Sequence, residues 1–146
     1  MTELSVILPV FDERDNLQVL YGELVQTLEA LATSYEVLFV DDGSTDGSNE
    51  VLAEIQSHDG NVRVIELRRN FGQTAALAAG FDFAVGNIVI TMDADGQNDP
   101  KDIPLLLSEI ERGFDMACGW RNERKDNFWR RRFPSLVANQ LISWTT

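Results

Sequence analysis

The chain has 146 residues, of which 44% are hydrophobic, and its 12 basic and 24 acidic residues give a net charge of −12. This length supports one domain with its own hydrophobic core, and the acidic balance argues against general nucleic-acid binding. No run of about eighteen apolar residues is present, so the sequence predicts no membrane-spanning helix. The single cysteine, Cys118, excludes an internal disulfide and lies in a strand-like segment, where we expect a buried thiol.

Apolar segments rich in β-branched residues alternate with segments of helical periodicity. The predicted strands are 4–10, 35–40, 62–67, 88–92 and 114–119. Leu17, Leu20, Leu24, Leu28 and Leu31 recur at helical spacing after the first strand. Further helices are expected from Asp46 or Ser48 to about Gln56, over 73–84, and from Pro100 to a stop at Gly113.

The alternation of strands and helices predicts an α/β fold with a mostly parallel sheet and helices on both faces. The last residues, 143–146, contain no stop signal and no closing strand. The pattern is typical of a truncated domain, so we expect the chain to be the N-terminal part of a longer protein.

Polar clusters follow four of the predicted strands, at positions 11–13, 41–44, 93–97 and 119–121. Any one cluster can be explained by helix capping. In a parallel sheet, however, all four would meet at the edge where open α/β sheets bind ligands. Asp93 and Asp95, one residue apart, can both address one hard cation, and such an ion can hold a diphosphate. The clusters therefore indicate metal-assisted chemistry on a phosphorylated substrate.

The segments LPVFDE (8–13), VDDGSTDG (40–47), MDAD (92–95) and GWR (119–121) resemble, in order, the motifs of family-2 inverting glycosyltransferases. The segment 68–80, RRNFGQTAALAAG, favours the branch of polyprenyl-phosphate sugar transferases similar to dolichol-phosphate-mannose synthase. The resemblance implies a Rossmann-like GT-A fold, a nucleoside diphosphate-sugar donor and a Mg²⁺ or Mn²⁺ ion. It also implies a polyprenyl phosphate acceptor on the cytoplasmic side of the membrane.

The resemblance assigns roles by position. Pro9, Phe11 and Glu13 would frame the nucleoside, Val40 and Asp42 would contact the base, and Arg121 would neutralise phosphate charge. Asp93 and Asp95 would be the catalytic carboxylates and, with Gln97, the metal ligands. The implied nucleotide site is Pro9, Phe11, Glu13, Val40, Asp42, Asp93, Ala94, Asp95, Gln97 and Arg121. The donor-binding core would span 1–121; no catalytic base can be assigned.

A basic and aromatic segment occupies 122–146. Arg130, Arg131 and Arg132 can be read as a solvated charge run. Next to Trp129, they also suit an interfacial segment that binds anionic lipid or a lipid phosphate, and a lipid-phosphate acceptor favours this second interpretation.

The sequence leaves several alternatives for the acceptor and the function open. The acceptor can be a polysaccharide or a glycolipid, or the chain can bind nucleotide without transferring sugar. Asp93-Ala94-Asp95-Gly96 also resembles the opening of haloacid-dehalogenase-like phosphatases, although it follows the fourth strand instead of the first. The sugar, the base and the oligomeric state, including a homo-oligomer, are not specified by the sequence.

Overall fold

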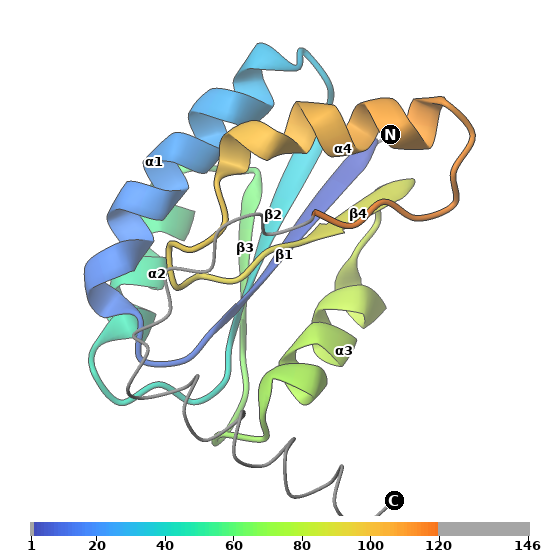
Figure 1. The fold of residues 1–146 in the computed structure, drawn as a ribbon. Helices are drawn as coiled ribbons and strands as arrows, with labels where there is room; N and C mark the ends of the chain where they lie inside the picture. The colour runs from blue at the N-terminus through green and yellow to red at the C-terminus, as the bar shows by residue number, and fades with distance from the viewer. Residues whose placement is uncertain (1, 120–146) are drawn as a thin grey trace, which may run out of the picture.

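A computed structural model describes residues 2–119, and these form four strands and four α-helices with one short 3₁₀ helix (Figure 1). The strands are β1 (Leu4–Val10), β2 (Tyr35–Asp41), β3 (Val62–Glu66) and β4 (Ile88–Thr91). The helices are α1 (Arg14–Ala30), α2 (Ser48–His58), α3 (Gln73–Phe83), η1 (Pro100–Asp102) and α4 (Ile103–Glu111). The first four predicted strands and the predicted helices are confirmed, with ends shifted by a few residues.

The four strands pair in the order β3-β2-β1-β4, and every pair is parallel. The chain builds the sheet outward from β1 through β2 to β3, and then returns to place β4 on the other side of β1. A reversal of this kind leaves a crevice at the carboxyl ends of the two strands that flank it, which here are β1 and β4.

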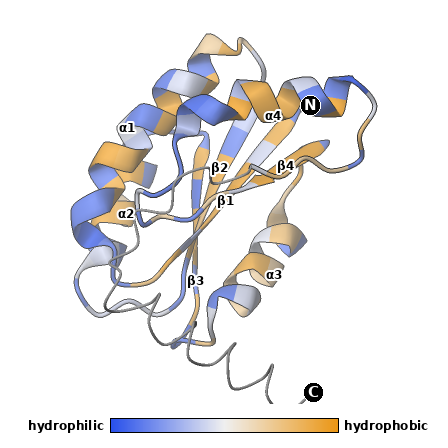
Figure 2. Cartoon of the chain, in the orientation of Figure 1, coloured by the Kyte–Doolittle hydropathy of each residue, from blue (hydrophilic) through white to orange (hydrophobic). Residues whose placement is uncertain are grey.

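Two hydrophobic layers enclose the sheet, as the fold class predicts. Helices α1, α2 and α4 cover one face and α3 covers the other (Figure 1). The larger core contains the inward leucines of α1 with alternate residues of β1, such as Val6 and Leu8. Four of the five predicted leucines, Leu17, Leu20, Leu24 and Leu28, are buried. Hydrophobic residues dominate the strands, whereas α1 mixes hydrophobic and hydrophilic positions (Figure 2).

Helix α3 lies very close to the sheet because its inward residues are small. A Cβ added at Gly80 would lie 2.4 Å from Cγ2 of Ile7, which is fully buried in β1. No side chain fits at this point without displacing the core, so Gly80 fixes the separation between α3 and β1.

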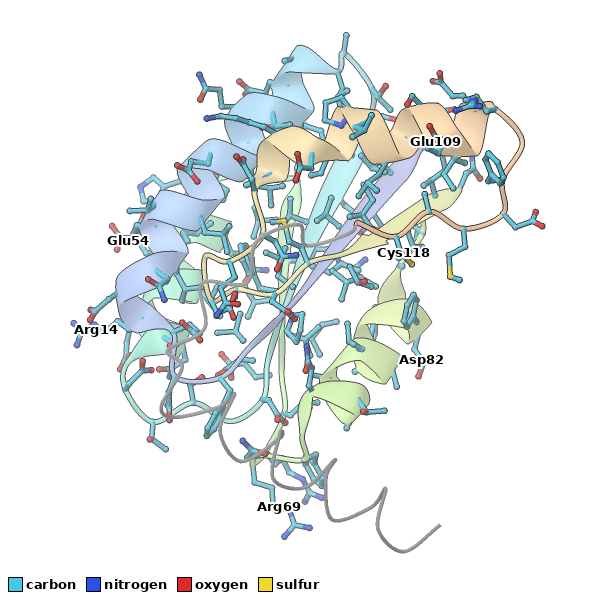
Figure 3. All side chains as sticks on the ribbon, viewed as in Figure 1. Arg14, Glu54, Arg69, Asp82, Glu109 and Cys118 are labelled. Atoms are coloured by element: carbon cyan, nitrogen blue, oxygen red, sulfur yellow. The ribbon has the colours of Figure 1, made fainter. Side chains whose placement is uncertain are left out.

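The predicted fifth strand at 114–119 is wrong. These residues follow the turn at Gly113 and belong to no helix or strand, and Phe114 and Met116 are exposed. Cys118, expected to be buried, is also exposed and lies on the segment that follows α4 (Figure 3). Alternation of apolar residues gives a segment strand propensity, but a strand forms only where a neighbouring backbone pairs with it.

Within residues 2–119, no helix combines the length and the apolar character needed to cross a membrane.

A buried carboxylate near the amino ends of the strands joins β1, β2 and β3 to the loop that precedes β4. Glu36 of β2 is 6% exposed and accepts hydrogen bonds from Ser5 Oγ at 2.6 Å and from the Val85 N–H at 2.8 Å. Arg63 of β3 donates to its other oxygen at 3.1 Å. Because Val85 lies between α3 and β4, this carboxylate also anchors the end of α3.

Burial raises the pKa of Glu36, but the hydrogen bonds from Ser5, Val85 and Arg63 outweigh burial and leave the pKa below its usual value. We predict that Glu36→Gln destabilises the fold by about 1–3 kcal/mol near neutral pH, because the new NH₂ would face the Arg63 guanidinium. A depressed pKa contributes stability above the unfolded value, here 4.5, and this contribution is lost as the pH falls through the folded value.

Urea unfolding of both proteins over a pH series measures this effect. The difference in unfolding free energy should be largest at neutral pH and should shrink below about pH 4.5. A difference that is independent of pH would show that the carboxylate charge does not stabilise the fold.

Candidate nucleotide and metal site

The loops that follow β1 and β2 are joined by side-chain to backbone hydrogen bonds. Asp12 adopts a left-handed backbone conformation, φ 53°, and its Oδ1 accepts the Thr45 N–H at 2.7 Å. Its own N–H donates to Ser44 Oγ at 3.0 Å, and the Glu13 N–H donates to Ser48 Oγ at 3.1 Å. These bonds hold the residues after β1 next to the residues after β2.

Asp42 connects the end of β2 to the loop that precedes α3. The residue is only 3% exposed, and its two carboxylate oxygens accept the N–H groups of Phe71 and Gly72, each at 2.8 Å. The neighbouring Gly43, φ 74°, lies directly under this loop, since an added Cβ would be 2.6 Å from the Arg69 carbonyl carbon. The loop 68–72 is therefore fixed to the carboxyl end of β2.

The segment after β4 carries the acidic motif Asp93-Ala94-Asp95. Met92 and Ala94 point into the core, whereas Asp93 is half-buried and Asp95 is exposed. Asp93 Oδ1 accepts a hydrogen bond from Gln73 Nε2 at 2.6 Å. Asp95 Oδ1 accepts the Gln97 N–H at 3.0 Å, which closes a tight turn between them.

These three loops and the start of α3 surround an open cavity of about 420 Å³ at the carboxyl ends of β1, β2 and β4. The residues around it are Pro9, Val10, Phe11, Glu13, Asp42, Asn70, Gly72, Gln73, Ala76, Asp93, Ala94, Asp95 and Gln97. The cavity is therefore located at the β1/β4 reversal, where the topology of the sheet leaves a crevice.

Most of the predicted site residues meet in this cavity. It contains Pro9, Phe11, Glu13, Asp42, Asp93, Ala94, Asp95 and Gln97. Val40 does not line it, because its side chain is fully buried in the core beneath α3. Arg121 and the predicted lipid-binding residues Trp129, Arg130, Arg131 and Arg132 lie outside the described residues.

Sequence reasoning did not assign a role to the wall formed by Asn70, Gly72 and Gln73. In the sequence, the segment 68–80 indicates the family resemblance and contains the start of the helix predicted over 73–84, but its polar residues carry no predicted role. The available signal was its position, since it follows β3 and its polar residues reach the same edge as the other loops. No local pattern indicated that Gln73 would contact Asp93.

The cavity has a strongly acidic lining. Glu13, Asp42, Asp93 and Asp95 contribute carboxylates, and no lysine or arginine among residues 2–119 lines it. An anionic ligand would be repelled from such a surface unless a cation accompanied it. The electrostatics thus favour a cation, and an anionic ligand would need such an ion to accompany it.

The donor set fits a hard divalent cation that retains open positions. Among residues 2–119, no group of three or more His, Cys, Asp or Glu residues is placed to hold a metal ion, so any such site has to use fewer of these ligands. Asp93 and Asp95 can supply carboxylate oxygens and Gln97 an amide oxygen, all from one loop. Mg²⁺ is usually bound in this way, through one or two carboxylates with water and substrate phosphates completing the coordination.

A sequence profile of glycosyl transferase family 2 matches residues 5–145 of the chain. The chain belongs to this family. It is 45% identical to a dodecaprenyl-phosphate galacturonate synthase of Rhizobium johnstonii, over 99% of the chain and 43% of that protein. It is 40% identical to an undecaprenyl-phosphate 4-deoxy-4-formamido-L-arabinose transferase of Edwardsiella ictaluri, over 98% of the chain and 44% of that protein. The chain thus spans less than half the length of the curated relatives it matches.

Solved structures of glycosyltransferases share the fold. S. aureus TarS (1–349) superposes with a TM-score of 0.62 at 22% identity, covering 76% of this chain and 33% of that one. A mannosyltransferase from Pyrobaculum calidifontis, solved with GDP-Man and Mn²⁺, gives a TM-score of 0.58 at 23% identity, covering 68% and 29%. The predicted GT-A fold is confirmed, and family membership rules out the phosphatase interpretation.

We predict that Asp42→Asn loosens the loop 68–72. An asparagine keeps one acceptor oxygen but turns an NH₂ toward the N–H of either Phe71 or Gly72, so one hydrogen bond is lost. Destabilisation of about 1–3 kcal/mol is expected, with faster amide hydrogen exchange at Phe71 and Gly72.

Asp12→Asn is the matched control, because Asp12 uses only Oδ1 as an acceptor for Thr45 and asparagine retains that atom. Asparagine also tolerates the left-handed conformation at this position. Equal effects of the two substitutions would contradict the assignment of Asp42 as the anchor of the loop.

Proposed function

We propose that the chain forms the donor-binding part of an inverting glycosyltransferase that moves a sugar from a nucleoside diphosphate to a polyprenyl phosphate. The cavity is the observation that supports this proposal most directly. Its acidic lining, its position at the sheet reversal and its open carboxylates suit a nucleoside diphosphate-sugar with a divalent cation. The two relatives described above carry a polyprenyl phosphate in their names, which favours this class of acceptor.

Each wall of the cavity would hold a different part of the donor. Phe11, 44% exposed, offers a ring on which a base can stack, and Pro9 and Glu13 stand beside it. Asp42 would accept the ring N–H of uracil or guanine in addition to its two backbone partners, since each carboxylate oxygen has two lone pairs. Asp93, Asp95 and Gln97 would face the diphosphate.

Mg²⁺ or Mn²⁺, when bound, would supply positive charge that offsets the charge on the departing diphosphate. The protein's own contribution would be to bind and orient the donor over Asp93 and Asp95, the proposed catalytic carboxylates. A phosphate acceptor is already ionised near neutral pH, so its activation would need little help from a general base. Positioning and charge stabilisation would then account for most of the rate enhancement.

The location of the reaction follows from the acceptor. A polyprenyl phosphate resides in the bilayer, so the enzyme would act at a membrane surface, and we propose that this is the cytoplasmic surface. The basic segment with Trp129 and Arg130 to Arg132 is proposed to contact the lipid phosphate or anionic headgroups; these residues lie outside the described part of the structure.

We predict that nucleoside diphosphate binding depends on a divalent cation and on Asp95. Asp95→Ala should weaken Mn²⁺-linked binding of UDP or GDP by about tenfold or more, because a charged ligand of the ion is lost while other carboxylates still repel the diphosphate. CDP should bind more weakly than UDP or GDP, since cytosine has no ring N–H for Asp42. Isothermal titration calorimetry with and without Mn²⁺ measures these affinities.

Asp102→Ala is the control, because Asp102 is an exposed carboxylate in η1 that does not line the cavity. It removes the same charge and should leave the affinity nearly unchanged. Equal weakening by both variants would attribute the effect to net charge, and undiminished Mn²⁺-linked binding by Asp95→Ala would refute its role as a ligand.

We also predict that the acceptor is a polyprenyl phosphate. The whole enzyme, of which this chain is the proposed donor-binding part, should form a lipid-linked monosaccharide from labelled nucleoside diphosphate-sugars and undecaprenyl phosphate in detergent, detected by thin-layer chromatography. The chain by itself should bind the donor without forming this product. A product formed only on a polysaccharide or glycolipid would establish the alternative acceptor class. Tight nucleotide binding without any product would identify the chain as a donor-binding unit alone.

A further inference from the structure

Gln73 is the residue through which α3 reaches the acidic motif after β4. It is the first residue of α3, and its amide Nε2 lies 2.6 Å from Asp93 Oδ1. Both side chains line the cavity, although they come from segments twenty residues apart. We propose that Gln73 is a positioning residue that orients the Asp93 carboxylate so that Asp93 and Asp95 address one divalent cation. This inference rests on the proposed function and concerns a residue to which that function assigned no role.

Asp42 fixes the backbone that immediately precedes Gln73. Asp42 accepts the N–H groups of Phe71 and Gly72, which are the two residues that precede Gln73. Gly72, φ 96°, then begins the helix, and its carbonyl accepts the N–H of Ala75 and of Ala76. The buried Asp42 carboxylate therefore fixes the position of the backbone from which the Gln73 side chain extends.

The helix that carries Gln73 and the segment that carries Asp93 both contact Ile7 of β1. The Ile7 side chain is the contact that sets the distance of α3 at Gly80. The Ile7 carbonyl accepts the N–H of Met92, the residue before Asp93, at 3.0 Å. Because the helix that carries Gln73 packs on Ile7 and the residue before Asp93 is hydrogen-bonded to it, β1 holds the two segments at a fixed separation, which favours a preorganised Gln73–Asp93 bond.

An amide is the suitable donor for this purpose. The terminal torsion of an aspartate is broad, so a single hydrogen bond restricts the direction of its oxygens considerably. A lysine or arginine at this position would also orient Asp93, but its charge would compete with a metal ion for the carboxylate. Gln73 is neutral, so it orients Asp93 and leaves the negative charge of the site intact.

The experiment compares Gln73→Met with Thr74→Met in the binding of UDP and GDP, with and without Mn²⁺. Methionine keeps the length of the glutamine side chain and its helix propensity but cannot donate. Gln73→Met should reduce the Mn²⁺-linked gain in nucleotide affinity on the order of tenfold, as loss of a partner that orients a metal ligand does. The loss of affinity should therefore be larger with Mn²⁺ than without it. Thr74 is exposed on the same turn and does not line the cavity, so Thr74→Met should match the wild type.

A double-mutant cycle tests whether Gln73 acts through Asp93. In an Asp93→Ala background, Gln73→Met should have no further effect on the Mn²⁺-linked gain. Gln73→Arg should raise the affinity measured without Mn²⁺ and lower the gain that Mn²⁺ adds, because the guanidinium takes the place of part of the cation's charge. Thermal unfolding of each variant verifies that the fold is retained.

The outcomes separate this inference from the proposed function. A wild-type chain that binds no nucleoside diphosphate in a Mn²⁺-linked manner refutes both. Mn²⁺-linked binding by the wild type with an unchanged gain in Gln73→Met refutes the positioning role alone. An equal effect of Gln73→Met in the presence and absence of Asp93 also overturns it, since Gln73 would then act by another route.

Discussion

The parallel pairing of β1 with both β2 and β4 is the constraint on which the arrangement of the site depends. It places the residues after three strands at one edge of the sheet, and it does so with β1 as the common neighbour. One residue of β1 positions segments on both sides of the cavity. The Ile7 side chain sets the position of α3, and the Ile7 carbonyl sets the position of Met92. A shift of β1 by one residue would exchange the two faces of the strand and move both walls of the cavity.

Carboxylates at the two ends of the sheet differ in burial and in the groups that surround them. Near the amino ends, Glu36 is buried and surrounded by donors, and within residues 2–119 no buried side-chain nitrogen or oxygen is without a hydrogen-bond partner. At the carboxyl ends, Asp93 and Asp95 are held near solvent beside other carboxylates, with no basic residue of the described chain in the lining. The first arrangement stabilises the fold, whereas the second places like charges close together, and a bound cation would relieve their repulsion.

The sequence predicted the parts of the structure that depend on periodicity and topology. The leucines of α1, the four described strands and the acidic loop after β4 were identifiable because local patterns and the rules of parallel sheets determine them. Long-range contacts were not identifiable. The hydrogen bond from Gln73 to Asp93 depends on the distance between α3 and β4, which no local pattern encodes. Segment 114–119 has strand-like alternation, but pairing decides whether a strand forms, and Cys118 is exposed for the same reason.

Asp42 combines two tasks that are usually separate in a binding site. Its hydrogen bonds to Phe71 and Gly72 hold the wall of the cavity, while its position on the lining makes it the proposed acceptor for the base. A change at this residue would therefore alter the shape of the site together with its base preference, so base specificity cannot be retuned here by one substitution. Phe11 is exposed and its ring carries no hydrogen-bonding group, so it is free of that coupling. Changes in nucleotide preference that preserve the fold should accordingly arise around Phe11 and the exposed loop residues, with Asp42 retained as the anchor of the wall.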